Sequence, residues 1–294
     1  MDLSIVIVNW NVRELLDCCL DSIYRNVRGL TFEVVVVDNA SHDASVEMVR
    51  SRYPQVQVIA NAENAGFCRG NNQGIEATTG DFVCLLNPDT EVYPGAMERL
   101  VGFLRERPDV GVVGPRLSSP PGVPTRPNGT MFPSFTHELL GVMAWHRPNK
   151  EAFERRSFGR SSFDETAEVD VVCGACLLTR RQVVEQIGGL DEALFMFFDE
   201  VDFCLRAKRA GWRVFVVPDA EILHVWMGSV KQDTQAGTRR LNRARFVFFR
   251  KHHGIVPAAA LWLACYLSEQ TRLARVRAVH GRDRLLGRRR AGDP

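Results

Sequence analysis

Short apolar runs rich in β-branched residues alternate with helically spaced segments through the first 116 residues. The runs at residues 3–8 and 32–37 (FEVVVV) are typical of strands buried on both faces of a parallel sheet. The remaining pattern predicts strands at 56–60, 82–86 and 110–113 and helices at 12–24, 43–52, 66–77 and 94–105. This rhythm predicts an α/β fold with an open, mostly parallel sheet flanked by helices.

The second half of the chain begins at a proline-rich boundary. Residues 117–128 contain four prolines, which remove backbone donors and favour a loop. Residues 131–168 have weak periodicity, so we expect an ordered but variable segment there. Farther on, the pattern predicts a strand at 169–178 interrupted by Gly174, helices at 180–187, 200–210 and 239–252, and a strand at 213–217 ended by Pro218.

Length and composition are those of an ordinary globular protein. The 294 residues are 45% apolar and 24% charged, which excludes collagen, coiled-coil and wholly disordered classes. The formal net charge of +2 conceals an uneven distribution, because 14 Lys or Arg face 3 acids from residue 239 onward. The first 238 residues carry 23 Lys or Arg against 32 acids. The basic C-terminal end is therefore a separate feature.

This basic end combines an apolar stretch with arginines, namely Trp262, Leu263, Tyr266, Leu267, Arg272, Arg275 and Arg277. Such a pattern favours an interfacial helix on an anionic membrane surface. A solvated tail and nucleic-acid binding are the alternatives, but no zinc-finger, RNA-recognition or helix-turn-helix pattern accompanies the arginines. The N-terminal run lacks preceding basic residues, and the eight cysteines lack the paired spacing of a disulfide framework. We therefore expect a cytoplasmic protein.

Polar clusters follow four of the predicted strands. They are Asn9 and Asn11, then Asp38, Asn39 and Ser41, then residues 64–72 (NAGFCRGNN), then Asn87 to Asp89 (NPD). Each cluster alone also matches ordinary turn chemistry. Together they lie where doubly wound sheets bind ligands, at the carboxyl ends of the strands. The turn at Gly66 with Arg69 suits a diphosphate, and Asp89 suits a Mg²⁺ or Mn²⁺ ion shared with substrate phosphates.

A second acidic cluster lies downstream, where Asp199, Glu200 and Asp202 follow the aromatic run FMFF. Acids at a helix N-terminus are common because the helix dipole favours them. Desolvation by the aromatic neighbours would raise the pKa of such an acid, as a general base requires. His224, after a short apolar run, is either a structural histidine or part of the same site.

Seven ordered motifs now indicate a family: SIVIVNWN, VVVVDNASHD, NAENAGFCRGNNQGI, GDFVCLLNPDTEV, GACLLTRR, IGGLDEALFMFFDEVDFCLRAKRAGW and ILHVWMGS. Over residues 3–254 the chain resembles family 2 glycosyltransferases of the Rossmann-like GT-A fold, in the bacterial rhamnosyltransferase-like group. The resemblance implies a glycosyltransferase domain at 1–254, with a nucleotide-sugar-binding half at 1–116 and an acceptor and catalytic half at 117–254. A basic, amphipathic, helical tail at 255–294 would follow.

The resemblance also implies roles for individual residues. The donor nucleotide would be held by Asn9, Asp38, Asn39, Gly66, Arg69, Asn71 and Asn87. Asp89 and His224 would bind the divalent cation, Mg²⁺ or Mn²⁺. This chain has Asn87 where the family's metal motif often starts with an acid. It also has Asp199-Glu200 where many relatives have Glu-Asp, so both acids remain candidates for the catalytic base.

The implied activity is inverting, metal-dependent transfer of a hexose from a dTDP- or UDP-sugar, with rhamnose as a candidate sugar. The acceptor would be a saccharide or a polyprenyl-diphosphate-linked sugar in cell-surface polysaccharide synthesis. The protein would be cytoplasmic and peripheral at the inner face of the membrane, with no nucleic-acid partner. Two other classes are weighed beside it: a non-catalytic nucleotide-sugar-binding pseudoenzyme and a nucleotidyltransferase. The latter would carry an arginine- and lysine-bearing Gly-rich loop near its N-terminus, which residues 9–12 lack.

Overall fold

A computed structural model describes residues 1–121, 123, 128–144, 164–225 and 234–285, with side chains at the C-terminal end up to residue 271. The chain forms two compact units. The first comprises Met1–Phe132 and Arg155–Ala244, and the second comprises Pro133–Glu154 and Arg245–Pro294. The predicted motif residues Trp226 to Ser229 and the side chains of Arg272, Arg275 and Arg277 lie outside the described part.

The first unit is built on a sheet whose N-terminal strands are all parallel. They are β1 (Leu3–Asn9), β2 (Phe32–Asp38), β3 (Gln57–Ala60) and β4 (Phe82–Leu86), in the order β3-β2-β1-β4. The chain first winds outward from β1 to β3 and then returns to place β4 on the other side of β1. The topological switch point therefore lies between β1 and β4, where open α/β sheets bind their ligands.

The other half of this sheet is mixed. β10 (Cys176–Arg180) runs antiparallel between β4 and β6 (Val110–Ser118), and β11 (Arg213–His224) runs parallel to β6. β5 (Thr90–Val92) and β8 (Ala167–Glu168) pair antiparallel with β11, and a separate two-stranded sheet joins β7 (Gly129–Thr130) to β9 (Val171–Val172). The predicted α/β sheet is thus confirmed, with an antiparallel insertion.

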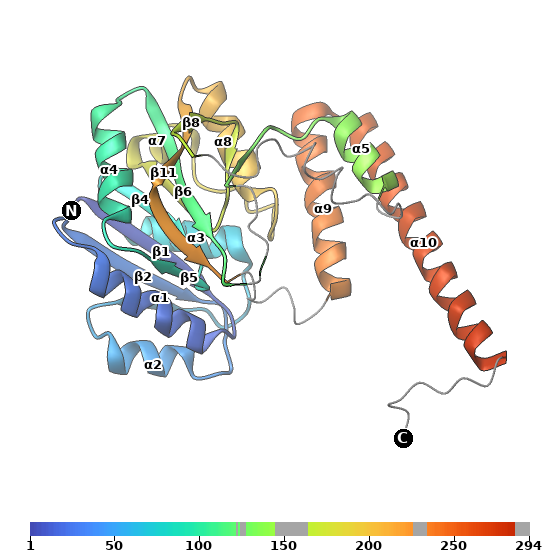
Figure 1. The fold of residues 1–294 in the computed structure, drawn as a ribbon, viewed down its shortest axis with the longest axis horizontal. Helices are drawn as coiled ribbons and strands as arrows, with labels where there is room; N and C mark the ends of the chain where they lie inside the picture. Colours follow the sequence, from blue (N-terminus) through green and yellow to red (C-terminus); the bar gives the residue numbers. More distant parts are fainter. Residues whose placement is uncertain (122, 124–127, 145–163, 226–233, 286–294) are drawn as a thin grey trace. The chain divides into compact units, whose positions relative to one another are not determined.

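Helices cover both faces of the sheet (Figure 1). Ile5 and Ile7 of β1 point into the main core with α1 (Arg13–Asn26), α2 (Ser45–Arg52) and α4 (Ala96–Glu106). Val8 on the opposite face packs with α3 (Phe67–Glu76). Glycines allow α3 to approach β1 closely, because a Cβ on Gly74 would lie 2.2 Å from Cγ1 of Val6. Two further helices, α7 (Arg181–Ile187) and α8 (Asp199–Arg209), lie between β10 and β11 in the chain.

Two predicted strand ends were wrong, and one helix was not predicted. The strand expected at 110–113 continues as β6 to Ser118. The strand expected at 213–217 does not end at Pro218 but continues as β11 to His224. An irregularity in the pairing with β6 between Val217 and Glu221 accommodates the proline, which cannot donate to a ladder. The weakly periodic segment 131–168 contains a helix, α5 (Phe135–Ala144), that the pattern did not predict.

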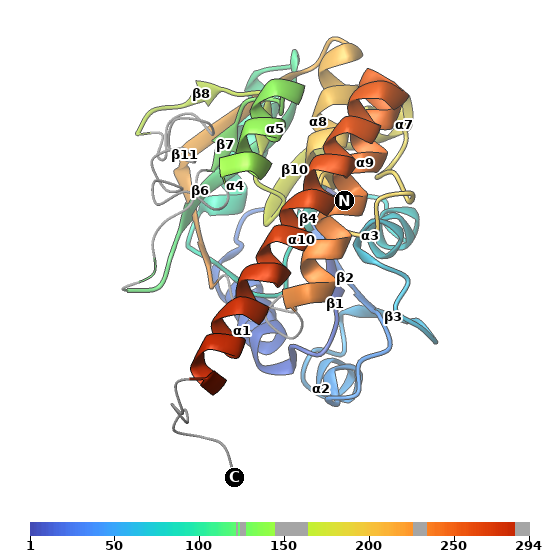
Figure 2. The same cartoon turned by 90° about the vertical axis from the view of Figure 1, so that its right-hand side faces the viewer.

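The second unit consists of α5, the end of α9 (Thr234–His253) and α10 (Ile255–Leu285), which Figure 2 shows as a long helix. α10 buries Ala258, Leu261 and Cys265 at helical spacing. Within the unit, Nε of Arg245 on α9 donates to Oε2 of Glu138 on α5 at 2.5 Å. Over the described residues, no helix combines the length and the apolar character that crossing a bilayer requires.

Candidate active site

The ends of β1 and β2 carry a buried polar network. Nδ2 of Asn9 donates to Oδ1 of Asp38 at 2.8 Å and to Oγ of Ser41 at 3.1 Å. The other Asp38 oxygen accepts from the Ser41 backbone N–H at 2.8 Å. Oδ1 of Asn9 is buried and has no hydrogen-bond partner among the described residues. A buried acceptor without a donor is costly, so this oxygen is suited to a ligand N–H or O–H.

Asn39 connects this network to the next strand end. Its Nδ2 donates to the carbonyl oxygen of Gly66 at 3.1 Å, and its Oδ1 accepts from Nδ2 of Asn61 at 2.9 Å. Its backbone N–H donates to the carbonyl oxygen of Asn9 at 2.9 Å. The Asn39 side chain thus ties the loop at 61–66 to the end of β2, and its backbone ties the end of β2 to the end of β1.

Gly66 forms a tight turn directly before α3. Its φ of +89° is a conformation that favours glycine, and a Cβ there would lie 2.6 Å from Cδ2 of Phe195. The backbone N–H of Phe67 donates to the carbonyl oxygen of Phe195 at 2.8 Å. The turn is therefore held against the segment that leads to the acidic cluster, 129 positions away in the sequence.

The other two predicted donor residues of this region lie on α3, but differ in exposure. The side chain of Arg69 is exposed. Asn71 is buried, and its Nδ2 donates to the carbonyl oxygen of Phe67 at 3.0 Å. The guanidinium of Arg69 is thus accessible to a ligand, as its predicted role requires. The side-chain amide of Asn71, in contrast, donates within its own helix.

Asp89, in the turn between β4 and β5, lies beside His224 at the end of β11. Nε2 of His224 is 3.1 Å from Oδ1 of Asp89, and both side chains are buried. The Val225 N–H donates to the Asp89 carbonyl oxygen at 2.9 Å. β5 begins directly after Asp89 and pairs with the end of β11, which sets Thr90 opposite His224. Sheet pairing thus joins two residues that are 135 positions apart.

A carboxylate oxygen beside an imidazole nitrogen is a suitable donor pair for a divalent cation. Among the described residues no group of three His, Cys, Asp or Glu side chains is arranged to hold a metal ion. Mg²⁺ and similar ions commonly take one or two protein ligands and complete their shell with water and substrate phosphates. The pair therefore fits a cation that binds together with a diphosphate.

The acidic pair begins α8, after two aromatic residues in an unusual conformation. Phe197 and Phe198 have φ values of +69° and +61°, which are uncommon for residues with a side chain and occur where surrounding structure enforces them. Burial raises the pKa of Asp199 to about 6. Burial, followed by the neighbouring Asp199 carboxyl, raises the pKa of Glu200 to about 8. Both carboxyls are thus weaker acids than usual and better proton acceptors once ionised.

The turn at Gly174 and Ala175 brings the NPD loop near this acidic pair. The backbone N–H of Asn87 donates to the carbonyl oxygen of Ala175 at 2.9 Å. A Cβ on Gly174 would lie 3.5 Å from both Cβ and Cδ of Glu200, so that side chain packs against the turn. Glu200 is therefore separated from the NPD loop by a single turn of backbone.

The sequence placed Asn72 and Asp202 in candidate clusters but did not show that they position this site. Nδ2 of Asn72 donates to the carbonyl oxygen of Leu190 at 2.9 Å, and its Oδ1 accepts from the Leu190 N–H at 2.8 Å. Asp202 is fully buried, and its Oδ2 accepts from Nε of Arg206 at 2.7 Å. The Arg206 guanidinium also donates to the carbonyl oxygens of Ile187 and Gly189. The four-residue spacing of Asp202 and Arg206 on a helix was the available signal.

A family model described as "Glycosyltransferase like family 2" matches residues 2–248. The chain belongs to glycosyltransferase family 2. This glycosyltransferase is 28% identical over 235 residues to the N-acetylglucosaminyl-diphospho-decaprenol L-rhamnosyltransferase of Mycobacterium tuberculosis (strain ATCC 25618 / H37Rv), and the match covers 75% of each chain. The predicted family is confirmed, and the activity is sugar transfer.

Solved structures confirm the GT-A fold of this glycosyltransferase. Residues 1–349 of S. aureus TarS in complex with UDP-GlcNAc match with a TM-score of 0.60 at 15% identity, covering 92% of this chain and 73% of that one. GalNAc-T7 with UDP, GalNAc and Mn²⁺ matches with a TM-score of 0.58 at 16% identity. That match covers 78% of this chain and 44% of the GalNAc-T7 chain.

Proposed function

We propose that this glycosyltransferase transfers a hexose, with rhamnose the candidate sugar, from a dTDP- or UDP-linked donor to a polyprenyl-diphosphate-linked saccharide. Transfer would invert the anomeric carbon and serve cell-surface polysaccharide synthesis. The observation that supports this most is the Asp89–His224 pair, 3.1 Å apart. Its loop is bonded through Asn87 to Ala175, in the same turn as Gly174, against which Glu200 packs. The mycobacterial relative's name, which specifies a diphospho-decaprenol acceptor, supports this acceptor class.

The nucleotide would bind at the ends of β1 and β2. The unpartnered Oδ1 of Asn9 and the carboxylate of Asp38 are acceptors for a base imide N–H and for ribose hydroxyls. Asn39 and Asn71 would act through the loop and helix that they fix. Arg69, exposed on α3, would pair with the diphosphate, and Asn87 would line the floor of the site beside Asp89.

The cation would be held by Asp89 and His224, whose buried pair fits such an ion. A bound Mg²⁺ or Mn²⁺ supplies positive charge that offsets the charge developing on the leaving diphosphate. The chain's own contribution is to fix the spacing of the two ligands. His224 ends β11, and Asp89 lies in the turn directly before β5, which pairs with the end of β11.

Glu200 would be the catalytic base. Its carboxylate would accept the proton of the acceptor hydroxyl as that oxygen attacks the anomeric carbon opposite the leaving diphosphate. The C–O bond to the acceptor forms, the bond to the diphosphate breaks, and the proton ends on Glu200. Asp199 would raise the basicity of Glu200 by Coulomb repulsion, which is the second cause of its high pKa. Such base catalysis typically contributes about 10²- to 10⁴-fold.

Attachment to the cytoplasmic face of an anionic membrane is part of the same proposal. On α10 the side chains of Trp262, Leu263, Tyr266 and Leu267 are exposed, whereas Ala258, Leu261 and Cys265 are buried within the unit. Arginines and lysines flank this apolar face in the sequence. An acceptor on a polyprenyl lipid requires an enzyme that works at the bilayer surface.

Calorimetry with nucleotide sugars tests the proposal. dTDP-rhamnose, UDP-glucose, UDP-N-acetylglucosamine, UDP-galactose and GDP-mannose are titrated with Mn²⁺ and then with chelator. We expect one donor to bind, at least tenfold more weakly after chelation or in Asp89→Asn, because a charged ligand is lost. Glu91→Gln, two positions away, is the matched control. A folded protein that binds none of these donors under either condition would indicate a non-catalytic family member.

A further inference from the structure

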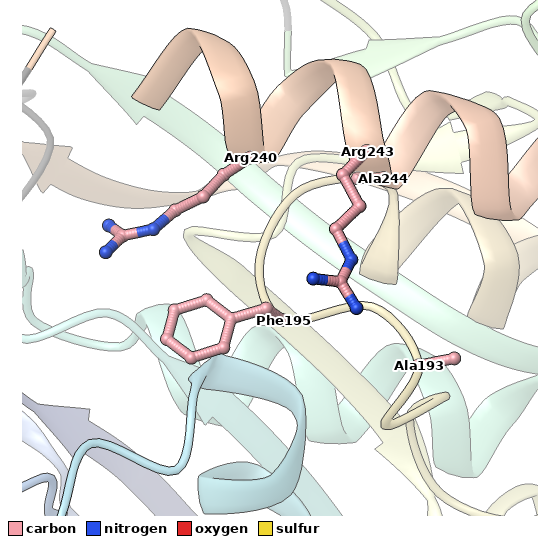
Figure 3. Close-up of a pocket in the computed structure, with 5 residues that line it drawn as sticks. All are labelled: Ala193, Phe195, Arg240, Arg243 and Ala244. Atoms are coloured by element: carbon pink, nitrogen blue, oxygen red, sulfur yellow. The ribbon is translucent and has the colours of Figure 1, made fainter. Parts of the chain in front are cut away.

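A pocket beside the segment that leads to the acidic pair is lined by two arginines that the proposed mechanism does not use. Arg240 and Arg243 reach from α9 toward Phe195, and Ala193 and Ala244 complete the lining (Figure 3). The cavity has a volume of about 210 Å³. All five residues belong to the first compact unit.

Phe195 fixes one side of this pocket. Its ring blocks any side chain at position 66, and its carbonyl oxygen accepts from the Phe67 N–H, so the segment cannot shift freely. The Arg240 guanidinium lies over the ring, with its carbon 5.1 Å from the ring centroid. Stacking of this kind orients an arginine without using its N–H donors.

Across the described part of the chain, neither the Arg240 nor the Arg243 guanidinium has a carboxylate within ion-pair distance, so both can donate hydrogen bonds to a ligand. Arg240 is half-buried and Arg243 is exposed, so one is pre-oriented and the other is accessible. Two arginines on one wall of a cavity that includes no acid among its lining residues form a site for a group carrying several negative charges.

The geometry points to an acceptor subsite: Arg240 and Arg243 bind the phosphate groups of the acceptor. This assignment rests on the proposed function and deepens it. Phe195 precedes the proposed base, Glu200, by five residues on the same segment. The base must contact the acceptor hydroxyl, so the rest of the acceptor lies against this segment. In the proposed function the donor diphosphate is held elsewhere, by Arg69 and by the cation that Asp89 and His224 would bind.

The pocket could also bind the phosphates of the donor instead of those of the acceptor. A direct binding experiment distinguishes these two ligands. Inorganic diphosphate is titrated by calorimetry into the full chain saturated with nucleoside diphosphate and Mn²⁺. We expect binding in the wild-type protein and at least a tenfold loss in Arg240→Gln/Arg243→Gln, since each charged hydrogen bond is worth about a factor of ten. Arg239→Gln, adjacent on α9 and absent from the pocket lining, is the control with equal charge loss per site.

Steady-state kinetics gives the second readout. With an N-acetylglucosamine diphosphate lipid as acceptor, the double variant should show a KM for the acceptor raised at least tenfold and a KM for the donor within twofold of wild type. With an alkyl glycoside of the same sugar, which lacks phosphate, wild type and variant should have similar acceptor KM values, because the arginines then have no partner.

Three outcomes would contradict the assignment of this pocket as an acceptor subsite. The first is diphosphate binding that nucleotide abolishes, which would assign the pocket to the donor. The second is equal diphosphate binding by the double variant and Arg239→Gln. The third is an equal rise in KM for both acceptors. If the wild-type chain transfers no sugar at all, the proposed function fails, and the calorimetric comparison still decides whether the two arginines form an anion site.

Discussion

At the scale of single residues, the site depends on two adjacent acids with different surroundings. Asp199 is buried, and Glu200 lies beside it against the Gly174 turn. Desolvation raises the pKa of both, and the charge on one carboxylate disfavours ionisation of the other. Two acids whose pKa values are separated in this way can have different roles, one as base and one as its electrostatic neighbour.

Substitution of each acid distinguishes these roles. Glu200→Gln should lower kcat by about 10²- to 10⁴-fold and leave donor binding intact, because the amide cannot accept the proton. Asp199→Asn should reduce kcat less. Rates of nucleoside diphosphate release and calorimetric donor affinity are the measurements. Nearly full turnover by Glu200→Gln, with loss in Asp199→Asn, would assign the base to Asp199.

The pH dependence follows from the same pair. The base must be ionised, so kcat/KM should rise with pH on an acid limb near the pKa of Glu200, about 8. Asp199→Asn removes a negative charge that raises this pKa, and the limb should therefore move to lower pH. A pH profile of both proteins from pH 5 to pH 9 measures the shift. A limb that stays in place would show that Asp199 does not act on the base.

The same shifts affect stability with a definite sign. Unfolded Asp and Glu ionise near pH 4, whereas the folded pair ionises at about 6 and 8. Between these limits the folded state binds more protons than the unfolded state. The contribution of the pair to stability is therefore present at low pH and is lost as pH rises through this window. A carboxylate pair that costs stability when ionised is consistent with a catalytic role.

At the scale of elements, α8 is positioned by contacts that lie outside the chemistry. Asp202 and Arg206 pair on α8, and Arg206 in turn donates to the last carbonyl oxygen of α7, that of Ile187. Asn72 ties α3 to Leu190 in the segment between them. Contacts with α7 and α3 thus fix the position of the acidic pair at the start of α8.

Removal of the Asp202 carboxylate should therefore destabilise the fold. Asp202→Ala leaves a mostly buried guanidinium without its anion, and we expect a loss of about 3 kcal/mol in the free energy of unfolding. Urea denaturation followed by circular dichroism is the measurement. Asp219→Ala, an exposed acid on β11, should change stability by less than about 0.5 kcal/mol. Equal effects of the two substitutions would contradict this role for Asp202.

At the scale of the whole molecule, the chain divides its charge and its exposed apolar surface unevenly. The second unit carries exposed side chains of Leu140, Met143, Trp262, Leu263 and Leu267. Much of the positive charge of the chain follows in the same C-terminal region. Apolar side chains beside basic ones are the combination that binds anionic bilayer surfaces.

Vesicle sedimentation tests this surface. Leu263→Ser/Leu267→Ser should weaken binding to vesicles containing phosphatidylglycerol by about tenfold, because each buried apolar side chain contributes about 1.5 kcal/mol or more. Met131→Ser removes an exposed apolar side chain of the first unit and should have no effect. Undiminished binding by the double variant, or concentration-dependent dimers that the variant abolishes, would instead assign this face to protein contacts.

The sequence by itself determined the class of fold and the family. Continuous apolar runs and period-3.6 patterns in the first 116 residues reflect which side chains are buried locally. Most strands and helices there were therefore predictable within a few positions, although β5 and the extension of β6 to Ser118 were not. Asp89 and His224 were named as a pair only through the family resemblance, because residues 135 positions apart share no local signal. That prediction rested on the order of the seven motifs along the chain, and no single motif would have supported it.

The tertiary structure alone decided how these residues act on one another. Sheet pairing through β5 set the 3.1 Å contact of Asp89 with His224, and burial set the pKa values of Asp199 and Glu200. The continuation of β11 past Pro218 and the contact of Phe195 with the Gly66 turn were likewise invisible in the pattern. Each depends on desolvation or contact between distant segments, which exist only once the chain has folded.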